Sequence, residues 1–162
     1  MWLLILGAKV IGTGFNPNKN RNLFYKLNLH KKIKLKVFDI RDFKKIEALV
    51  KKNKPEIIFH LAAQPLIYES YVKPHLTFDV NIRGTLNILE ITKKFNFIKS
   101  SIFVTSDKCY ENSNSTKGFL ETDRLGGKDP YSASKASAEL LVRSYRDSFF
   151  KNKKNVVFQV DE

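Results

Sequence analysis

Two short motifs in the second half of the chain carry residues that could perform chemistry. A Thr-Ser-Asp-Lys segment at residues 105–108 follows an apolar run, and Tyr131 precedes Lys135 by four residues. Residues four apart on a helix share one face, so the Lys135 ammonium can lie beside the Tyr131 phenol and favour its ionised form. A phenol with an ordinary pKa of about 10 needs roughly 4 kcal/mol of stabilisation to ionise near neutral pH. The motifs therefore predict redox chemistry on a hydroxyl group, coupled to proton transfer.

The segments around the two motifs indicate whether the motifs form a functional site or lie on a surface helix. A Tyr-x-x-x-Lys spacing alone is common on solvent-facing helices. Here residues 101–104 predict a strand that ends at the Thr-Ser-Asp-Lys segment, and open parallel sheets bind ligands at their strand ends. Asp129 and Pro130 predict a turn directly before the helix that carries Tyr131. This context favours a functional site over a surface helix.

Apolar runs and amphipathic stretches alternate along the chain. The pattern predicts an α/β fold, a partial Rossmann-like, doubly wound parallel sheet with flanking helices. The expected strands are 9–12, 35–39, 56–62, 101–104 and 156–160, and the expected helices are 43–53, 76–95 and 131–150. Residues 2–6 are interpreted as the end of a first helix, because the glycines near the N-terminus lack the Gly-x-Gly-x-x-Gly spacing. The first strand and its Gly-rich loop are therefore expected to be missing.

Composition narrows the class of protein. A chain of 162 residues suits one domain, and it has no apolar run near the ~20 residues of a membrane helix. Residues 1–6 are too short for an anchor and lack the pattern of a signal peptide. A single cysteine, Cys109, indicates a reducing compartment, so we expect a cytoplasmic protein without a membrane partner.

The net charge of +13 raises nucleic-acid binding as an alternative. The lysine clusters at 31–36, 51–54 and 151–154 fall in expected turns or helix ends, where lysine normally faces water. No nucleic-acid-binding motif accompanies them. Solvated faces are the favoured interpretation, and no nucleic-acid partner is expected.

Several motifs, in one order along the chain, carry a resemblance to a known family. They are residues 6–12, 23–24, 39–42, 55–66, 70–71, 81–85, 105–110, 126–132 and 148–150. Together they resemble the extended short-chain dehydrogenase/reductase superfamily, and within it the CDP-glucose 4,6-dehydratases. The UDP-N-acetylglucosamine 4,6-dehydratase group is a similar alternative, but residues 60–66 and 70–71 fit the CDP-glucose group better.

The resemblance implies a role for each residue of the two motifs. Tyr131 would deprotonate the sugar C4 hydroxyl while a hydride passes to NAD, and Lys135 would lower the pKa of Tyr131 and hold the nicotinamide ribose. Ser106 would donate a hydrogen bond to the C4 oxygen. Lys108 would remove the C5 proton as a neutral amine, and Asp107 would protonate the departing C6 hydroxyl. The product would be a 4-keto-6-deoxyglucose nucleotide, with NAD regenerated in each cycle.

The resemblance also implies a set of NAD contacts and no metal. The implied cofactor residues are Asn16, Asp39, Ile40, Leu61, Ala62, Ala63, Gln64, Asn81, Thr105, Tyr131 and Lys135. Asn16 stands where relatives usually carry an acidic residue that grips the adenosine ribose. Two of these residues have structural alternatives, because Asp39 could cap the helix that begins near residue 43 and Asn81 could steady a turn.

Three further residues have an alternative interpretation. Lys108 could be a solvated lysine at a strand end. Cys109 is interpreted as a packing residue rather than a nucleophile, and His60 as a buried histidine rather than an acid or a metal ligand.

The resemblance finally implies that residues 1–162 are an incomplete NAD-binding epimerase/dehydratase domain. The C-terminal lobe that binds the sugar nucleotide is expected to be absent, so the fragment would be inactive alone. CDP-glucose would be the substrate of the full-length parent. A homodimer through helices 76–95 and 131–150 is expected, and a non-catalytic dimerisation module is the alternative function.

Overall fold

The computed structural model describes residues 1–15, 23–111 and 118–150. The chain divides into two compact units, an N-terminal unit of residues 1–42 and a C-terminal unit of residues 43–162. The strand predicted at 156–160 lies outside the described residues.

The N-terminal unit is built around one pair of parallel strands. Strand β1 (Ile11–Gly14) pairs with β2 (Lys34–Val37), with Ile11 opposite Lys34. The other elements are α1 (Trp2–Ile5), α2 (Leu23–Lys26) and the 3-10 turn η1 (Leu29–Lys31). Gly7 follows α1 with φ of +80°, a backbone conformation that residues with a Cβ rarely adopt. None of the described residues of this unit is buried.

The C-terminal unit contains a second pair of parallel strands. Strand β3 (Ile57–His60) pairs with β4 (Ser100–Phe103), with Ile57 opposite Ser100. In the doubly wound strand order 3-2-1-4-5-6, strands 2 and 3 are neighbours and so are strands 4 and 5. The two pairs match these neighbours. The described elements include no strand that corresponds to strand 1.

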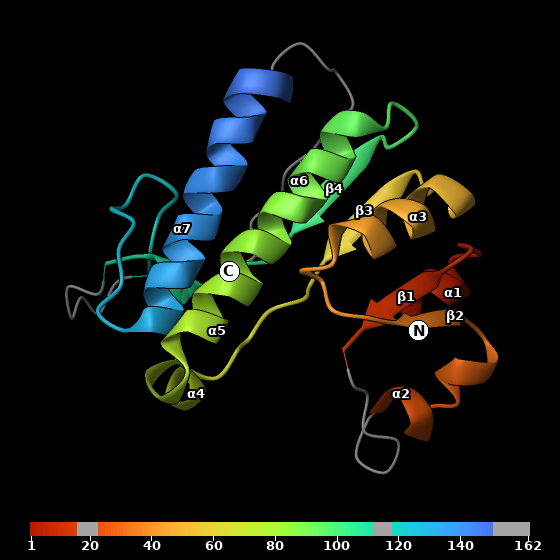
Figure 1. Cartoon of the computed structure of the whole chain (residues 1–162), viewed down its shortest axis with the longest axis horizontal. Helices are drawn as coiled ribbons and strands as arrows, with labels where there is room; N and C mark the ends of the chain where they lie inside the picture. Colours follow the sequence, from red (N-terminus) through yellow and green to blue (C-terminus); the bar gives the residue numbers. More distant parts are fainter. Residues whose placement is uncertain (16–22, 112–117, 151–162) are drawn as a thin grey trace. The chain divides into compact units, whose positions relative to one another are not determined.

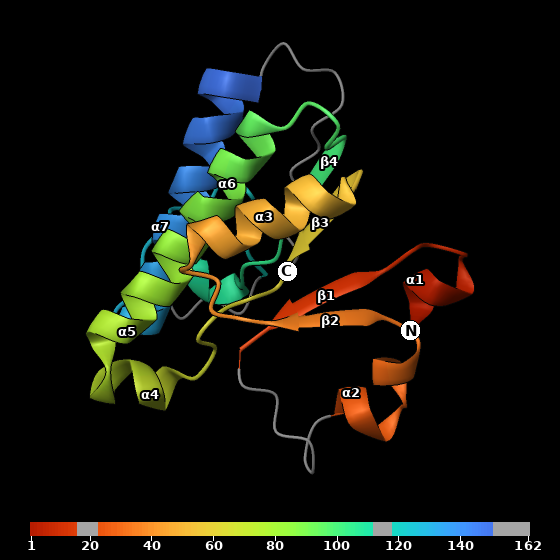
Figure 2. The same cartoon turned by 45° about the vertical axis from the view of Figure 1, so that its right-hand side comes forward.

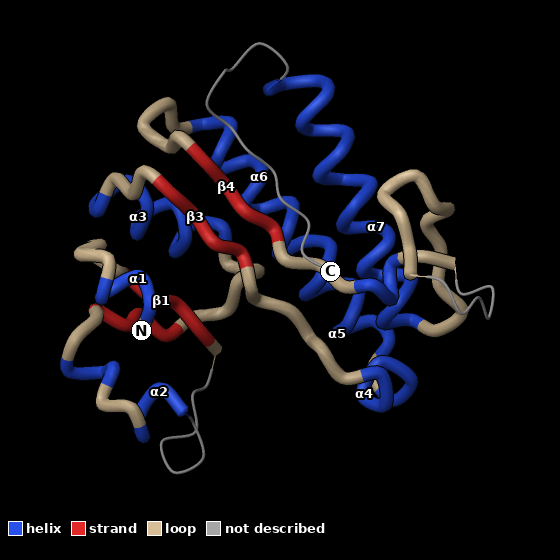
Figure 3. Tube along the Cα trace, turned by 180° about the vertical axis from the view of Figure 1, so that it is seen from behind, coloured by secondary structure: helices blue, strands red, loops and turns tan. Residues whose placement is uncertain are grey.

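Helices cover the second strand pair and form the core with it. Figures 1, 2 and 3 show α3 (Phe43–Asn53) and α6 (Gly84–Lys94) on one face of the pair, with α7 (Pro130–Tyr145) alongside α6. The helix predicted at 43–53 is present as α3, and it buries Ile46 and Val50. Fully buried side chains from α6 and β4 meet between the helices and the strands, and the largest are Leu89, Ile91 and Phe103.

The helix predicted at 76–95 was wrong in its start and in its continuity. Helix α4 (Ile67–Val72) precedes it, and α5 (Pro74–Phe78) begins at Pro74, which suits the first helical position because it lacks an N–H group. A π-helical turn at Asp79–Arg83 then separates α5 from α6. A second π-helical turn, Arg146–Phe150, follows α7 within the range predicted as one helix. Both long helices thus change their hydrogen-bonding pattern where the sequence shows unbroken amphipathicity.

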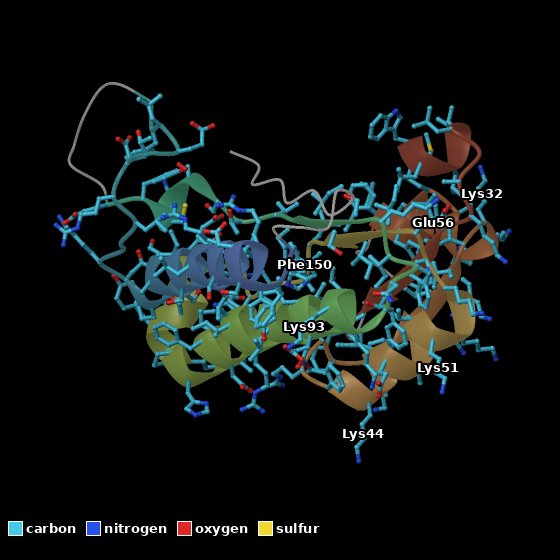
Figure 4. The ribbon with its side chains drawn as sticks, turned by 90° about the horizontal axis from the view of Figure 1, so that it is seen from above. Lys32, Lys44, Lys51, Glu56, Lys93 and Phe150 are labelled. Carbon is cyan, nitrogen blue, oxygen red and sulfur yellow. The ribbon has the colours of Figure 1, made fainter. Side chains whose placement is uncertain are left out.

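Lysine side chains on α3 point away from the protein. Lys44 and Lys51 are exposed, and Figure 4 shows both extending from the ribbon. Lys51 belongs to the cluster at 51–54, and its placement fits the interpretation of that cluster as a solvated face. In the described residues no helix has the length and apolar character needed to cross a membrane.

Candidate active site

The turn after β4 gathers three of the predicted catalytic residues. Ser106 has an extended backbone and caps a short 3-10 turn, η3 (Asp107–Cys109), by accepting a hydrogen bond from the Lys108 backbone N–H at 3.2 Å. Its hydroxyl donates to Asp107 Oδ1 at 3.1 Å, and Lys108 Nζ donates to Asp107 Oδ2 at 3.1 Å. The three side chains therefore form one hydrogen-bonded cluster.

The charges within this cluster favour an ion pair at neutral pH. The hydrogen bond from Lys108 lowers the pKa of the Asp107 carboxyl, with smaller help from Ser106. Both side chains are about half exposed, 52% for Lys108 and 53% for Asp107. Lys108 Nζ and the Asp107 carboxylate therefore form an exposed ion pair.

The start of α7 positions Tyr131 through its cap and a close backbone contact. Asp129 accepts hydrogen bonds from the Ser132 backbone N–H at 2.9 Å and from its hydroxyl at 2.6 Å, and Pro130 occupies the first turn. A Cβ at Gly127 would lie 2.3 Å from Ser132 Cβ and 2.6 Å from two backbone atoms. Only glycine fits there without a shift, so the Gly-Gly-Lys-Asp-Pro segment packs directly on this turn.

Tyr131 and Lys135 are both buried on the inner side of α7, with 8% and 6% of their surfaces exposed. Lys135 Nζ lies 6.0 Å from the centre of the Tyr131 ring and donates a long hydrogen bond of 3.5 Å to Val104 O. Burial lowers the pKa of Lys135, and the charge of Glu139 opposes that effect. Among the described residues, this is the only hydrogen bond that the ammonium donates. Two N–H groups thus remain for a bound molecule.

A small cavity of about 10 Å³ lies at the carboxyl ends of β3 and β4, next to Lys135. Its lining is formed by His60, Ala62, Ala63, Asn81, Thr85, Phe103, Val104, Thr105, Lys135 and Ala138. Five residues predicted to contact a cofactor are therefore gathered around one cavity. Leu61 and Gln64 belong to the same loop, and Leu61 is 68% exposed. The structure places η3 against α7, which brings the two predicted motifs together.

Asn81 ties the loop after β3 to α7. Its Oδ1 accepts from the Gln64 backbone N–H at 2.7 Å, and its Nδ2 donates to Gln64 O at 3.2 Å and to Ser134 Oγ at 2.8 Å. These bonds satisfy the buried amide group. They support the structural alternative for Asn81, and its cofactor contact stays a prediction.

His60 and Cys109 are both buried, as the sequence predicted. His60 is 6% exposed, its Nε2 lies 3.2 Å from Thr85 Oγ1, and burial with the nearby Lys135 charge lowers its pKa to about 4. Cys109 is fully buried, and burial raises the pKa of its thiol to about 11. Neither residue is charged at neutral pH. No cluster of three or more metal-ligating side chains occurs within residues 1–15, 23–111 and 118–150.

The remaining predicted residues belong to the N-terminal unit. Asp39 accepts hydrogen bonds from Arg41 Nε at 3.0 Å and from Arg41 Nη2 at 2.7 Å, which lowers the pKa of the carboxyl. Among the described residues the Asp39 carboxylate pairs with Arg41, and it does not cap α3 as the structural alternative had suggested. Ile40 is half-buried, and Asn16 lies outside the described residues. The cofactor contacts of all three stay predictions.

Comparisons with known proteins settle the family. A family model described as GDP-mannose 4,6 dehydratase matches residues 2–156. The chain belongs to this family. Membership agrees with the resemblance drawn from the motifs, and it covers almost the whole chain.

Two curated relatives of the chain are nucleotide-sugar 4,6-dehydratases. The chain is 41% identical to a CDP-glucose 4,6-dehydratase of Salmonella typhimurium over 93% of its own length and 42% of that enzyme's length. It is 31% identical to the dTDP-glucose 4,6-dehydratase of the same organism, over 68% of this chain and 36% of that enzyme. The chain thus spans less than half of the length of both enzymes.

Solved structures confirm the predicted α/β, Rossmann-like fold. A UDP-glucose 4-epimerase of Thermotoga maritima, solved with UDP-glucose, matches with a TM-score of 0.80 and 25% identity. The match covers 98% of this chain and 48% of the epimerase. The dTDP-glucose 4,6-dehydratase of Bacillus anthracis, solved in complex with NAD, has a TM-score of 0.75 and 23% identity over 98% of this chain and 48% of its own.

The sequence did not point to every residue that builds the site of this family member. Glu139 accepts a hydrogen bond from Thr105. Ser134 accepts one from Asn81, and Thr85 is hydrogen-bonded to His60. Glu139 follows Lys135 by four residues, the spacing that also joins Tyr131 to Lys135, so a search for a third member of that row would have found it. Ser134 and Thr85 carry no such signal, because their contacts join residues far apart in the sequence.

Proposed function

We propose that this chain is part of a nucleotide-sugar 4,6-dehydratase that converts CDP-glucose to CDP-4-keto-6-deoxyglucose with NAD. The observation that carries the proposal is the hydrogen-bonded Ser106, Asp107 and Lys108 cluster, which packs against the helix that presents Tyr131 and Lys135. The 41% identity to a CDP-glucose 4,6-dehydratase supports the choice of sugar nucleotide. The chain spans 42% of that enzyme, so the activity is proposed for a longer protein that contains these residues.

The residues near Lys135 suit the ribose and nicotinamide of NAD, because two ammonium N–H groups and the rim of small side chains are available there. Bound NAD would supply a temporary hydride acceptor for the sugar C4 carbon. Tyr131 would take the proton of the C4 hydroxyl through its phenolic oxygen, and Ser106 Oγ would donate a hydrogen bond to the C4 oxygen. Lys135 would orient the ribose and, as a cation, stabilise the ionised form of Tyr131.

Asp107 and Lys108 would perform the elimination of water. In the ion pair, Asp107 has no proton to give and Lys108 has no free lone pair, so each group starts in the wrong charge state for its role. One proton moved from Lys108 Nζ to Asp107 Oδ2 along the existing hydrogen bond corrects both. Substrate binding would favour this transfer, because removing water disfavours the two charges. The Lys108 amine then takes the C5 proton, and Asp107 protonates the departing C6 hydroxyl. Return of the hydride to C6 and of a proton from Lys108 to C5 would complete the 4-keto-6-deoxy sugar.

Two further features belong to this proposal. We expect the parent protein to be cytoplasmic and to form a homodimer through residues 76–95 and 131–150. The exposed apolar side chains of Leu140 and Phe149, both in residues 131–150, support this interface. We expect the 162-residue chain alone to show no turnover of CDP-glucose. If it is a dimerisation module instead, it will dimerise in a sizing measurement, and NAD will leave its melting temperature unchanged.

A chimera tests the proposed function directly. Residues 2–156 would replace the matching segment of the Salmonella CDP-glucose 4,6-dehydratase, and the loss of water from the nucleotide sugar would be followed by mass spectrometry. We expect turnover of CDP-glucose in preference to dTDP-glucose and UDP-N-acetylglucosamine. A folded chimera that dehydrates none of the three would overturn the proposal, and preference for UDP-N-acetylglucosamine would favour the alternative dehydratase group.

Two variants of the chimera separate the two halves of the reaction. Tyr131→Phe removes the proton acceptor for C4 oxidation, so reduction of NAD and water loss should both fall about 100-fold or more. Lys108→Met should block water loss while CDP-glucose still reduces NAD. Glu69→Gln is the matched control, because Glu69 forms an exposed ion pair with Lys73 and should leave both steps unchanged.

A further inference from the structure

One acidic side chain stands in line with the proposed catalytic pair. Tyr131, Lys135 and Glu139 follow one another at intervals of four residues on α7, so they lie along the same side of the helix. Glu139 is half-buried, and Thr105 Oγ1 donates a hydrogen bond to its carboxylate. Thr105 directly precedes Ser106 at the end of β4. Glu139 therefore connects the segment that carries the Ser106 cluster to the helix that carries Tyr131 and Lys135.

Lys135 also needs a negative charge nearby. Lys135 is only 6% exposed. In the described part of the chain its ammonium donates a single hydrogen bond, the long one to Val104 O. A buried charge without compensation is strongly disfavoured. The titratable groups that face Lys135 are His60 on β3, Cys109 on η3, and Tyr131 and Glu139 on α7 itself. His60 and Cys109 are uncharged at neutral pH, so Glu139 is the carboxylate in this group.

The surroundings of Glu139 keep it available for this role. Burial raises the pKa of its carboxyl above the ordinary value, and the Thr105 hydroxyl and the charges of Arg143, Lys135 and Arg146 oppose this rise without cancelling it. Arg143 and Arg146 follow Glu139 by four and seven residues, whereas Lys135 precedes it by four, so the arginines lie on the opposite side of Glu139 along the helix axis. Three cations thus lie near the Glu139 carboxylate, and among the described residues Glu139 is the one carboxylate whose charge acts on Lys135.

We infer that Glu139 is a positioning residue of the site. It holds the end of β4 against α7 through Thr105, and its charge keeps Lys135 protonated beside Tyr131. The inference rests on the proposed function for its catalytic meaning, and it adds a residue to which neither the motifs nor the relatives' names assign a role. Lys135 can stabilise an ionised Tyr131 only while it carries its proton, so Glu139 acts on the proton transfer through Lys135.

A titration of Lys135 in the purified 162-residue chain tests this without substrate or cofactor. The ¹³C resonance of the Lys135 side-chain Cε is followed with pH by NMR, and it is assigned as the signal that disappears in Lys135→Met. Glu139→Gln keeps an oxygen that can accept the Thr105 hydrogen bond but removes the charge. We expect the proton affinity of Lys135 to fall about tenfold in this variant, a pKa change of about 1.

Matched variants separate the charge from the packing. Glu139→Asp retains the charge and should restore most of the proton affinity of Lys135, and Thr105→Val should lower it far less than Glu139→Gln does. Glu69→Gln, which removes an exposed carboxylate of the same unit, should leave the Lys135 titration unchanged. An unchanged Lys135 pKa in a folded Glu139→Gln variant would overturn the inference.

A reciprocal measurement keeps the test decisive if Glu139→Gln does not fold. Because coupling between two sites is mutual, Lys135→Met should raise the pKa of Glu139 by the amount that Glu139→Gln would lower that of Lys135. The side-chain Cδ resonance of Glu139 reports this change, and no response there would contradict the inference. Absence of turnover in the chimera with normal coupling in both titrations would instead reject the proposed function alone.

Discussion

The two units differ in what their apolar residues do. In the C-terminal unit Leu89, Ile91 and Phe103 are at most 1% exposed and form a core between α6 and the β3–β4 pair. In the N-terminal unit Trp2 is 71% exposed and Phe15 73%, and none of the described residues is buried. Both units contain one pair of parallel strands, so strand pairing alone does not produce a core.

The C-terminal unit is the structurally self-sufficient part of the proposed enzyme. Parallel strands are normally buried on both faces, and a unit of about 40 residues rarely builds enough core alone. The C-terminal unit meets that need with α3 and α6 on one face of its strand pair and α7 packed against α6. The groups proposed for proton transfer all lie in this unit, whereas Asp39 and Ile40, the predicted adenine contacts, lie in the other.

The largest effect that would test the comparison is a core truncation. Leu89→Ala leaves a cavity at a fully buried site and should lower the free energy of unfolding by about 2–5 kcal/mol. Val37→Ala, the matched change in β2, removes a side chain that is 56% exposed and should cost less than about 0.5 kcal/mol. Urea denaturation followed by circular dichroism measures both. Equal losses would contradict the difference in burial between Leu89 and Val37.

The second effect concerns pH, because the C-terminal unit buries an uncharged histidine. The pKa of His60 is about 4 in the folded chain against 6.5 as its ordinary value. Between these values the unfolded chain binds a proton that the folded chain does not, so His60 makes stability fall as the pH falls from 6.5 to 4. The loss should approach about 3 kcal/mol.

A histidine replacement isolates this contribution from that of the carboxyl groups. His60→Gln should flatten the fall in stability over this pH range, measured by urea denaturation at each pH. The exposed His75 provides the control, since His75→Gln should leave the slope as it is in the unchanged protein. A His60→Gln variant with the full slope would contradict the assignment.

The smallest of the three effects compares two glycines. Gly127→Ala places a methyl group 2.3 Å from Ser132 Cβ, so it should destabilise the chain by about 1–3 kcal/mol and disturb the start of α7. A Cβ at Gly14, in the N-terminal unit, meets nothing within 4 Å, so Gly14→Ala should change the midpoint of urea unfolding little. Similar shifts for both variants would refute the tight contact at Gly127.

The sequence predicted the elements of this fold better than their details. The start and end of α3 were predicted correctly because its apolar period is regular and Pro55 follows it. The predicted strands were placed within a few residues of β1 to β4, since short apolar runs mark buried parallel strands. The π-helical turn at Asp79–Arg83 was not predicted, because π and α turns have the same residue preferences and differ only in hydrogen bonding.

For the candidate site, too, the sequence predicted which residues belong together better than it predicted their contacts. Motif spacing brought Ser106, Asp107, Lys108, Tyr131 and Lys135 into one hypothesis, and the structure gathers these residues in one unit. Spacing did not reveal the contact between Thr105 and Glu139, which joins residues 34 apart in the chain. Contacts of this kind depend on how a strand end meets a helix, and a single sequence does not encode them locally.

Because of the π-helical turn at residues 79–83, the geometry of the site depends on the number of residues in this part of the chain. Such a turn holds one residue more than an α-helical turn, and that residue sets the direction in which Asn81 points. Deleting one residue of this turn would restore regular α-helical hydrogen bonding while α5 and α6 keep nearly their present directions, and it would turn the side chains inside the turn. Asn81 would then lose Gln64 and Ser134 together. The spacing of these residues, as well as their identity, is therefore part of what specifies the site.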